Sequence, residues 1–390
     1  MGLTVDDVFE HVHGVCFKKG PPRRVGAETE WFVREGGEVV AISRLRTALA
    51  ADLPAGSRVT FEPGGQLELS TLPFATAGQV CEALERDLEA VRERLPGVEL
   101  HGYGVDPAGV PPMQLTEPRY RCMGEYFGDL TMMCATASVQ VSVDVGLEVE
   151  RRWRLAHMLG PVLVAAFANS ATHEGRLTGW RSTRQAVWAR MDRSRTGAPR
   201  GGDPVTSWAE YALDARVMLV RGESWTADPG MTFREWLRSG DPTLDDFAYH
   251  LTTLFPPVRP QGWLELRMID ALPEPYWRVP VAVVSALMDA VPDAAEAAAE
   301  PVAGRWAVAA LDGLTDRALG RAALACFEAA LAALPDGPLK TVTAEYADRY
   351  VARGRTPADD RPGPVRRERE HQAKERQAEE RQAKEQMWTR

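Results

Sequence analysis

Residues 138–145 read SVQVSVDV, a stretch in which every second side chain is a valine. In a β-strand, successive side chains point to opposite faces, so the valines would share one face and Ser138, Gln140, Ser142 and Asp144 the other. A strand with one apolar and one polar face covers a hydrophobic core on one side only, as in many antiparallel sheets. The stretch therefore predicts a sheet with one face open to solvent or to a ligand.

Three further segments alternate in the same way and predict strands: Val25–Val33, Arg58–Leu72 and Trp263–Ile269. A Pro-Gly-Gly turn at 63–65 interrupts the second of them. Because these strands come as hairpin-like neighbours early in the chain while helices accumulate late, we expect an α+β fold with an antiparallel or mixed sheet rather than a doubly wound fold. Helices are expected at Ala77–Leu95 after the N-cap Thr76, at Glu148–Asn169 with a kink or break at Pro161, after the caps Thr232 and Thr243, and through most of Pro280–Ala325.

The composition is that of a globular chain with a sizeable core, since 45% of the 390 residues are hydrophobic and 26% are charged. A net charge of −9 argues against a nucleic-acid partner, and no apolar run is long enough to span a bilayer. The N-terminus lacks the features of a signal peptide, and the five cysteines form no Cys-x-x-Cys pair. We therefore expect a cytoplasmic protein with neither a disulfide framework nor a zinc site.

The last stretch of the chain differs from the rest. From Arg361 it reads Arg-Pro-Gly-Pro, and three near-repeats follow, QAKER, QAEER and QAKEQ. Their alanines recur every five residues, which fits no helix face, and charges of both signs are mixed. We therefore divide the chain into a folded body, residues 1–355, and a charged tail, residues 356–390, that is disordered or forms a solvated helix. A specific partner site in the tail is the alternative.

The polar faces of the predicted strands are rich in carboxylates. Glu28 and Glu30 project from the same face of one strand, Glu68 lies on the polar face of the next, and Glu265 shares a face with Arg267. An ordinary solvated face would also alternate, but the first two segments carry glutamates with no cation on the same face, and such like charges are destabilising. A divalent cation with oxygen ligands would relieve the repulsion, and Mg²⁺ bridging to substrate phosphates is the usual solution.

A second cluster is basic. Residues 179–197 read GWRSTRQAVWARMDRSRTG and hold five arginines. An exposed basic loop would explain the last three of them, whereas Arg181 and Arg184 are better candidates for a site because guanidinium groups bind carboxylate or phosphate oxygens in bidentate fashion. There is no Gly-Lys-Ser/Thr triplet, which excludes a Walker-type phosphate loop. The two clusters together indicate phosphoryl transfer by metal ions and arginines.

Five segments in order, VGAETEWFV, FEPGGQLELS, MMCATASVQVSVD, GWRSTRQAVWARMDRSRTG and WLELRMIDALP, resemble the bacterial and plant type of glutamate–cysteine ligase. The similarity runs from about Val5 to Tyr350 and is greatest to the actinobacterial branch that supplies γ-glutamylcysteine for ergothioneine biosynthesis. It implies a glutamine-synthetase-like fold, in which a curved antiparallel sheet forms a funnel over the active site. It also implies ATP, L-glutamate and L-cysteine as substrates and Mg²⁺ or Mn²⁺ as the metal.

The resemblance further implies roles for individual residues. Arg267 matches the arginine that meets the transferring phosphoryl group, Arg181 and Arg184 match substrate- or phosphate-binding arginines, and Gln140 stands where some relatives have a histidine. The residues of the amino-acid pockets would be Arg119, Tyr120, Tyr126, Ser138 and Trp180. The metal would be held by Glu28, Glu30, Glu62, Glu68, Gln140 and Glu265.

Two other functions stay open on the sequence alone. The chain could be a related ligase that joins glutamate to another amine, or a guanidino phosphotransferase on the same fold. It could also be a non-catalytic, ligand-binding relative, although the retention of all five carboxylates counts against that hypothesis. The choice of amine depends on a few pocket residues that sequence cannot place.

Overall fold

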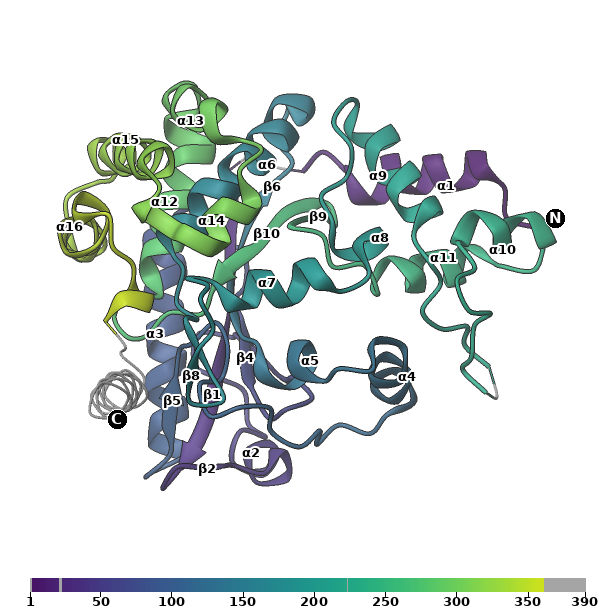
Figure 1. Cartoon of the computed structure of the whole chain (residues 1–390), viewed down its shortest axis with the longest axis horizontal. Helices are drawn as coiled ribbons and strands as arrows, with labels where there is room; N and C mark the ends of the chain where they lie inside the picture. Colours follow the sequence, from purple (N-terminus) through teal and green to yellow (C-terminus); the bar gives the residue numbers. More distant parts are fainter. Residues whose placement is uncertain (1, 21–22, 223, 361–390) are drawn as a thin grey trace, which may run out of the picture.

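The structure is a computed structural model that describes residues 2–20, 23–222 and 224–360. In this part of the chain a sheet of eight strands stands at the centre, with helices on both sides (Figure 1). The main path of the sheet has the strand order β3-β4-β1-β6-β10-β9, and each pairing along it is antiparallel. The predicted α+β class with an antiparallel sheet is therefore confirmed.

All four predicted strand segments are present. The strands of the main path are β1 (Val25–Glu35), β3 (Arg58–Phe61), β4 (Leu67–Ser70), β6 (Ser138–Asp144), β9 (Val258–Pro260) and β10 (Trp263–Asp270). Two short strands, β2 (Glu38–Val39) and β5 (Glu99–His101), pair with β1, and β7 (Thr172–His173) and β8 (Arg176–Leu177) form a separate hairpin. The expected turn divides β3 from β4, and glycine is required there because a Cβ atom on Gly64 would lie 2.0 Å from the carbonyl oxygen of Cys134.

One face of the sheet is covered by the hydrophobic core. The valines of β6 are at most 1% exposed, and helices α3 (Ala77–Arg94), α6 (Val149–Ala166) and α12 (Arg278–Ser285) contact β1, β10 and β6 respectively. Behind them lie further helices (Figure 1). These are η2 (Ala286–Ala290), α13 (Pro292–Ala299), η3 (Glu300–Val302), α14 (Trp306–Asp312), η4 (Gly313–Thr315), α15 (Arg317–Ala333), α16 (Pro338–Arg349), η5 (Val351–Arg353) and η6 (Pro357–Asp359).

Shorter helices lie on the other side of the sheet, where its polar face is (Figure 1). They are α1 (Val5–His11), η1 (Val12–Cys16), α2 (Ile42–Ala48), α4 (Pro118–Phe127), α5 (Thr131–Ala135), α7 (Thr183–Arg190), α8 (Arg193–Thr196), α9 (Pro204–Asp214), α10 (Phe233–Ser239) and α11 (Leu244–Leu251). No helix of the described ranges is long and apolar enough to cross a membrane.

The predicted helix starts are confirmed, since the hydroxyls of Thr76, Thr232 and Thr243 each accept a backbone N–H of the first turn. The break expected at Pro161 is wrong, because α6 runs through it without interruption. Proline removes one hydrogen bond of the helix, but Pro161 and its neighbours Val162 and Leu163 are buried in the core, which offsets that loss.

The folded body extends beyond the expected boundary at residue 355. Ala358 is 5% exposed, Asp359 forms an ion pair with Arg181, and Asp360 accepts from Arg349 Nη2 and Tyr350 Oη, both at 2.7 Å. The first residues assigned to the tail therefore belong to the body. The remainder of the predicted tail, residues 361–390, lies outside the described residues.

Candidate active site

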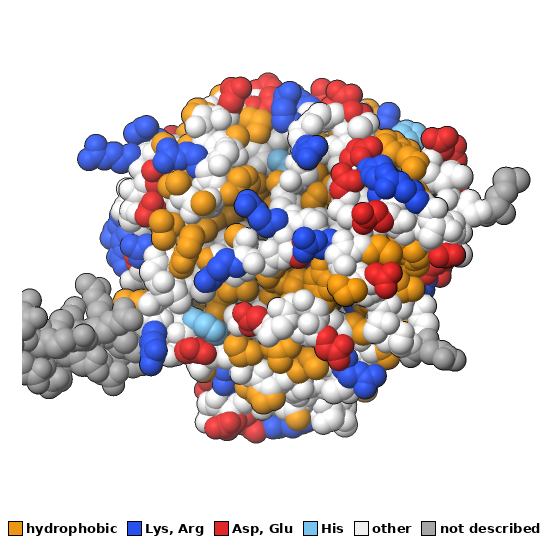
Figure 2. Space-filling model, turned by 45° about the vertical axis from the view of Figure 1, so that its right-hand side comes forward, with side chains coloured by type: hydrophobic (Ala, Val, Ile, Leu, Met, Phe, Trp, Pro, Cys, Tyr) orange, Lys and Arg blue, Asp and Glu red, His pale blue; other side chains and the backbone are white. Residues whose placement is uncertain are grey.

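A cavity of about 1040 Å³ lies against the polar face of the sheet. Strands β1, β3, β4, β6, β9 and β10 contribute its floor, and α1, α4, α5, α7, α9 and α11 contribute to its walls. Figure 2 turns this side of the molecule toward the viewer, and basic side chains stand beside hydrophobic ones near the middle of that face. The residues singled out from the sequence that line the cavity are Glu28, Glu30, Glu62, Glu68, Arg119, Tyr120, Gln140, Arg184 and Arg267.

Strand register brings the carboxylates together. Glu30 on β1 lies directly opposite Glu68 on β4, and Glu28 lies directly opposite Gln140 on β6. Side chains in such cross-strand pairs have Cβ atoms about 4.5–5.5 Å apart, and like charges in this position repel one another. The arrangement therefore concentrates negative charge at the centre of the polar face.

Burial and mutual repulsion both raise the pKa values of these glutamates. Burial, together with the charges of Glu265 and Glu68, raises the pKa of Glu28 to about 8. Burial and the charges of Glu68 and Glu30 raise the pKa of Glu62 well above its ordinary value. Carboxylate oxygens are the ligands that Mg²⁺ and Mn²⁺ take, and a cation among these side chains would favour their ionised forms.

Glu30 is fixed by its neighbours on β6. Its carboxylate accepts from the backbone N–H of Ser138 at 2.8 Å, from the hydroxyl of Ser138 at 2.9 Å, and from Gln140 Nε2 at 3.0 Å. On β4, Glu68 accepts from the hydroxyl of Thr60 at 2.5 Å. Within residues 2–20, 23–222 and 224–360, no group of three or more His, Cys, Asp or Glu side chains is placed so that it could hold a metal ion. Mg²⁺ usually takes only one or two carboxylates and completes its shell with water and substrate phosphates, so this donor set is compatible with it.

Arg267 lies at an irregularity in β10. Between the pairs Leu266–Val141 and Ile269–Val139, β10 has one residue more than β6, which is a β-bulge. Bulges redirect side chains and are frequent beside active sites. The guanidinium group of Arg267 reaches into the cavity, where its Nη1 donates to Glu265 Oε2 at 2.8 Å and to Gln140 Oε1 at 2.5 Å.

Arg184, on α7, is 4% exposed and faces the same cavity. Its Nη2 donates to the carbonyl oxygen of Arg267 at 3.0 Å, while Nε and Nη1 have no hydrogen-bond partner among the described residues. Burial lowers the pKa of Arg184, although the nearby charges of Asp270 and Glu30 oppose this effect. A buried cation with two unused donors is suited to an anionic group of a substrate.

Five of the residues singled out from the sequence do not line this cavity. Arg181 is held by Asp359, and Trp180 lines a second cavity on the other side of α7 together with Tyr126. Glu265 and Ser138 are each 1% exposed and lie behind the lining, where they hold Arg267 and Glu30. Arg181, Trp180 and Tyr126 are therefore placed away from the carboxylates, whereas Glu265 and Ser138 support residues that face the cavity.

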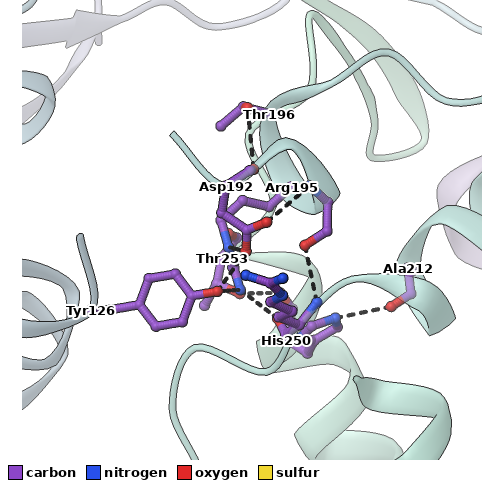
Figure 3. Close-up of polar contacts among 9 residues, drawn as sticks. Tyr126, Asp192, Arg195, Thr196, Ala212, His250 and Thr253 are labelled. Carbon is purple, nitrogen blue, oxygen red and sulfur yellow. Dashed lines mark hydrogen bonds and ion pairs between the residues drawn. The ribbon is translucent and has the colours of Figure 1, made fainter. Parts of the chain in front are cut away.

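The hydroxyl of Tyr126 donates to Asp192 within a buried network around Arg195 (Figure 3). Arg195 is 0% exposed, and its guanidinium group also contacts Asp192 at 3.2 Å and the carbonyl oxygen of Thr253 at 2.8 Å. The expectation that Arg195 belongs to an exposed basic loop is wrong. The charge of Arg195 is compensated by Asp192, and its donors are taken by carbonyl groups that would otherwise be unpaired in the interior.

Sequence reasoning missed Arg259, which lies on β9 and lines the cavity. A strand of three residues is too short to show an alternating pattern. The strand that carries Arg259 could have been found from the Gln261–Gly262 pair before Trp263. A glycine-containing turn of this length predicts a hairpin and therefore a partner strand for β10.

An antiparallel sheet with opposed glutamates and arginines over one cavity defines the chain as an enzyme of the carboxylate–amine ligase class. The chain belongs to glutamate-cysteine ligase family 2 (GCS2), whose model matches residues 24–380. The resemblance noted from the sequence motifs is thereby confirmed.

Two relatives found by sequence agree with this assignment. Glutamate–cysteine ligase EgtA of Mycolicibacterium smegmatis is 39% identical over 388 residues, covering 92% of this chain and 90% of the relative. A chloroplastic glutamate–cysteine ligase of Medicago truncatula is 33% identical, covering 71% of this chain and 62% of the relative. Among solved structures, a bifunctional glutathione synthetase from Pasteurella multocida matches with a TM-score of 0.48 and 15% identity, over 90% of this chain and 49% of that one.

Proposed function

We propose that the protein joins the γ-carboxylate of L-glutamate to the amine of L-cysteine at the expense of ATP, forming γ-glutamylcysteine. The observation that carries the proposal is the opposition of Glu28, Glu30, Glu62 and Glu68 to Arg184 and Arg267 across one cavity. Family membership and the relatives named glutamate–cysteine ligase support the choice of reaction.

The carboxylates would hold Mg²⁺ or Mn²⁺. We assign this role to Glu28, Glu30, Glu62 and Glu68, of which an ion would take one or two, with Gln140 as a further ligand, while Glu265 holds Arg267 behind the lining. The bound cation would neutralise charge on the phosphates of ATP. The raised pKa values of Glu28 and Glu62 support this assignment, because both groups are buried beside other carboxylates, and a cation would favour their ionised forms.

The reaction needs no nucleophile from the protein. The γ-carboxylate of glutamate attacks the γ-phosphorus of ATP and ADP leaves, which gives γ-glutamyl phosphate. The amine of cysteine then attacks the carbonyl carbon of this acyl phosphate, and inorganic phosphate leaves. The protein contributes by orienting the reactants and by stabilising the charge that develops on the transferring oxygens.

Arg267 is suited to the charge-stabilising role. Its guanidinium group is held from two sides, by Glu265 and Gln140, so it is already oriented before the transition state forms. Arg184 would bind a substrate carboxylate or phosphate through its unused Nε and Nη1. Arg119 and Tyr120, which also line the cavity, are our candidates for the amino-acid pocket.

Measuring ADP release with glutamate and a panel of amines would test the proposal. We expect release to require both glutamate and cysteine, with α-aminobutyrate as a thiol-free analogue that reports how far the thiol is recognised. Faster release with an amine unrelated to cysteine would identify a different carboxylate–amine ligase. The absence of glutamate-dependent release with every amine would instead indicate a non-catalytic relative.

The likeness to the actinobacterial enzymes extends the proposal to the cell. We infer that γ-glutamylcysteine made by this protein enters ergothioneine biosynthesis, and that the reaction takes place in the cytoplasm. A strain without the protein should lose ergothioneine and regain it when γ-glutamylcysteine is supplied. Unchanged ergothioneine in such a strain would contradict the assignment to this pathway.

A further inference from the structure

A second arginine stands beside Arg267 on the wall of the cavity. Arg259 on β9 lies directly opposite Glu265 on β10, and Glu265 and Arg267 are two residues apart on the same strand, so all three project from one face. The guanidinium groups of Arg259 and Arg267 line the cavity, while Glu265 is 1% exposed behind them.

Glu265 holds both arginines through a single oxygen. Its Oε2 accepts from Arg259 Nε at 2.7 Å and from Arg267 Nη1 at 2.8 Å. Two ion pairs, one from Arg259 and one from Arg267, therefore converge on this one buried carboxylate. One negative charge is shared between two positive charges, which leaves a surplus positive charge on this wall.

Solvent compensates for little of this surplus, since the side chains of Arg259 and Arg267 are only 16% and 13% exposed. An oxyanion in the cavity would compensate for this positive charge, and guanidinium groups bind such anions through planar pairs of donors. Glu28, a candidate metal ligand, lines the same cavity from β1, two strands away from β10. A phosphate group has oxygens that point toward both sides, so it can contact the arginines and a metal ion together.

The order of the strands separates the roles of the two arginines. Arg267 is bonded to Gln140 on β6 and therefore lies next to the carboxylate cluster, whereas Arg259 lies one strand farther away, on β9 at the edge of the sheet. The phosphoryl group being transferred belongs beside the carboxylates. A phosphate that stays with the nucleotide would lie farther out, toward β9 at the edge of the sheet.

We propose that Arg259 binds a phosphate that ADP retains, and that Glu265 positions Arg259 and Arg267 for adjacent phosphates of one nucleotide. This inference rests on the proposed function, because it takes ATP as the ligand of the cavity. It adds a nucleotide-binding residue and gives the nucleotide a direction across the sheet, with its base toward β9.

The test is equilibrium binding of AMP, ADP and ATP to the full chain without amino acids, measured by calorimetry at fixed Mg²⁺. We expect Arg259→Gln to lower the affinity for ADP and ATP on the order of ten- to a hundredfold, which is the usual effect of losing hydrogen bonds to a charged group. The affinity for AMP should change little. Arg259→Lys should be intermediate, because it keeps the charge and loses the planar geometry. Arg238→Gln, which removes an exposed arginine on α10 away from the cavity lining, is the control and should leave ADP binding unchanged.

Two results would overturn the inference. Normal ADP binding by Arg259→Gln with a raised KM for glutamate or cysteine would make Arg259 a carboxylate-binding residue. If the affinities for AMP, ADP and ATP fell equally and the melting temperature also fell, the role of Arg259 would be structural. Arg259→Lys provides the same measurements if the Gln variant does not fold. Nucleotide binding requires no amine, so a wild-type protein that binds ADP but uses an amine other than cysteine would refute the proposed function and leave this inference standing.

Discussion

Ser138 donates both its hydroxyl and its backbone N–H to the carboxylate of Glu30, at 2.9 and 2.8 Å. The family resemblance predicts that Ser138 belongs to an amino-acid pocket, yet this residue is 1% exposed and its hydroxyl has Glu30 as its partner. A residue that holds a metal-binding carboxylate in place affects the metal first and the substrates only through it.

Ser138→Ala should therefore change the metal requirement. The variant keeps the backbone bond to Glu30 and loses the hydroxyl bond, so we expect the Mg²⁺ concentration for half-maximal activity to rise on the order of tenfold, with little change in the KM for cysteine. Thr341→Ala, which removes an exposed hydroxyl on α16, is the control. A higher KM for an amino acid at saturating Mg²⁺ would instead place Ser138 in a substrate pocket.

Glu28 should couple metal binding to pH. Because its pKa is about 8 without a cation, the carboxyl group is mostly protonated at neutral pH and must lose its proton to become a ligand. The affinity for Mg²⁺ should therefore rise with pH up to about 8, by about tenfold per unit from Glu28 alone, and binding should release protons. Calorimetry in buffers of different ionisation enthalpy measures this release.

Glu28→Gln should weaken Mg²⁺ binding and flatten its dependence on pH, because the variant has no proton to lose at this position. Glu68→Gln removes the carboxylate that lies opposite Glu30, so it should also lower the affinity for Mg²⁺ and the activity. Glu38→Gln, an exposed site on the neighbouring β2, should behave as wild type. Normal turnover of the first two variants at low millimolar Mg²⁺ would contradict the assignment of these glutamates to the metal.

Arg267→Lys should act on the transition state. Lysine keeps the positive charge but cannot reproduce the planar contacts with Glu265 and Gln140 that orient Arg267. Removing such a donor typically lowers turnover by about a hundredfold or more, so we expect a lower kcat with little change in the KM for ATP or glutamate. The opposite pattern, an intact kcat with a raised KM for glutamate, would mean that Arg267 binds the substrate carboxylate and that Arg184 stabilises the phosphoryl group.

Tyr126→Phe should affect stability and leave the kinetic constants unchanged. The hydroxyl of Tyr126 donates to the buried carboxylate of Asp192, so its removal should lower the free energy of unfolding by about 1–2 kcal/mol. Tyr211→Phe is a matched control, because the hydroxyl of Tyr211 is buried without a partner in the described part of the chain. A changed KM for glutamate or cysteine in Tyr126→Phe would restore the role in a substrate pocket that the sequence suggested.

The strands and their polar faces were predictable because alternation is a local property of the sequence. Spacing within each strand assigns to its polar face the residues Glu28, Glu30, Glu68 and Gln140. The register between the strands then brings these polar faces side by side. The bulge that aims Arg267 was not predictable, because it depends on a mismatch between β10 and β6 that neither strand reveals by itself.

The arginines show a different limit. Arg181, Arg184 and Arg195 come from one basic stretch with similar local sequence, yet one pairs with Asp359, one faces the cavity, and one is buried beside Asp192. Their surroundings come from segments as distant as η6 and α11, so spacing within the stretch carries no information about them. Only the packed fold decides which guanidinium group has a partner and which is left for a substrate.

His250 should make the fold sensitive to mild acid. It is 4% exposed and its Nε2 lies 3.0 Å from the carbonyl oxygen of Ala212, where a neutral ring donates (Figure 3). Burial, with a contribution from the charge of Arg195, lowers the pKa of His250 to about 3, against about 6.5 in the unfolded chain. Between these values the unfolded chain binds a proton that the folded protein does not, so stability falls as the pH drops below about 6.5.

At pH 5 this single residue should account for about 2 kcal/mol of lost stability relative to pH 7.5, since each pH unit below 6.5 contributes about 1.4 kcal/mol. His250→Gln keeps a donor for Ala212 and cannot titrate, so its free energy of unfolding should be lower at pH 7.5 but should decline less steeply toward pH 5. Urea unfolding at both pH values measures the two slopes, with His13→Gln, at an exposed site, as the control. Equal slopes for His250→Gln and wild type would mean that the folded protein accepts the proton, for which the ring would have to leave Ala212 and reach water.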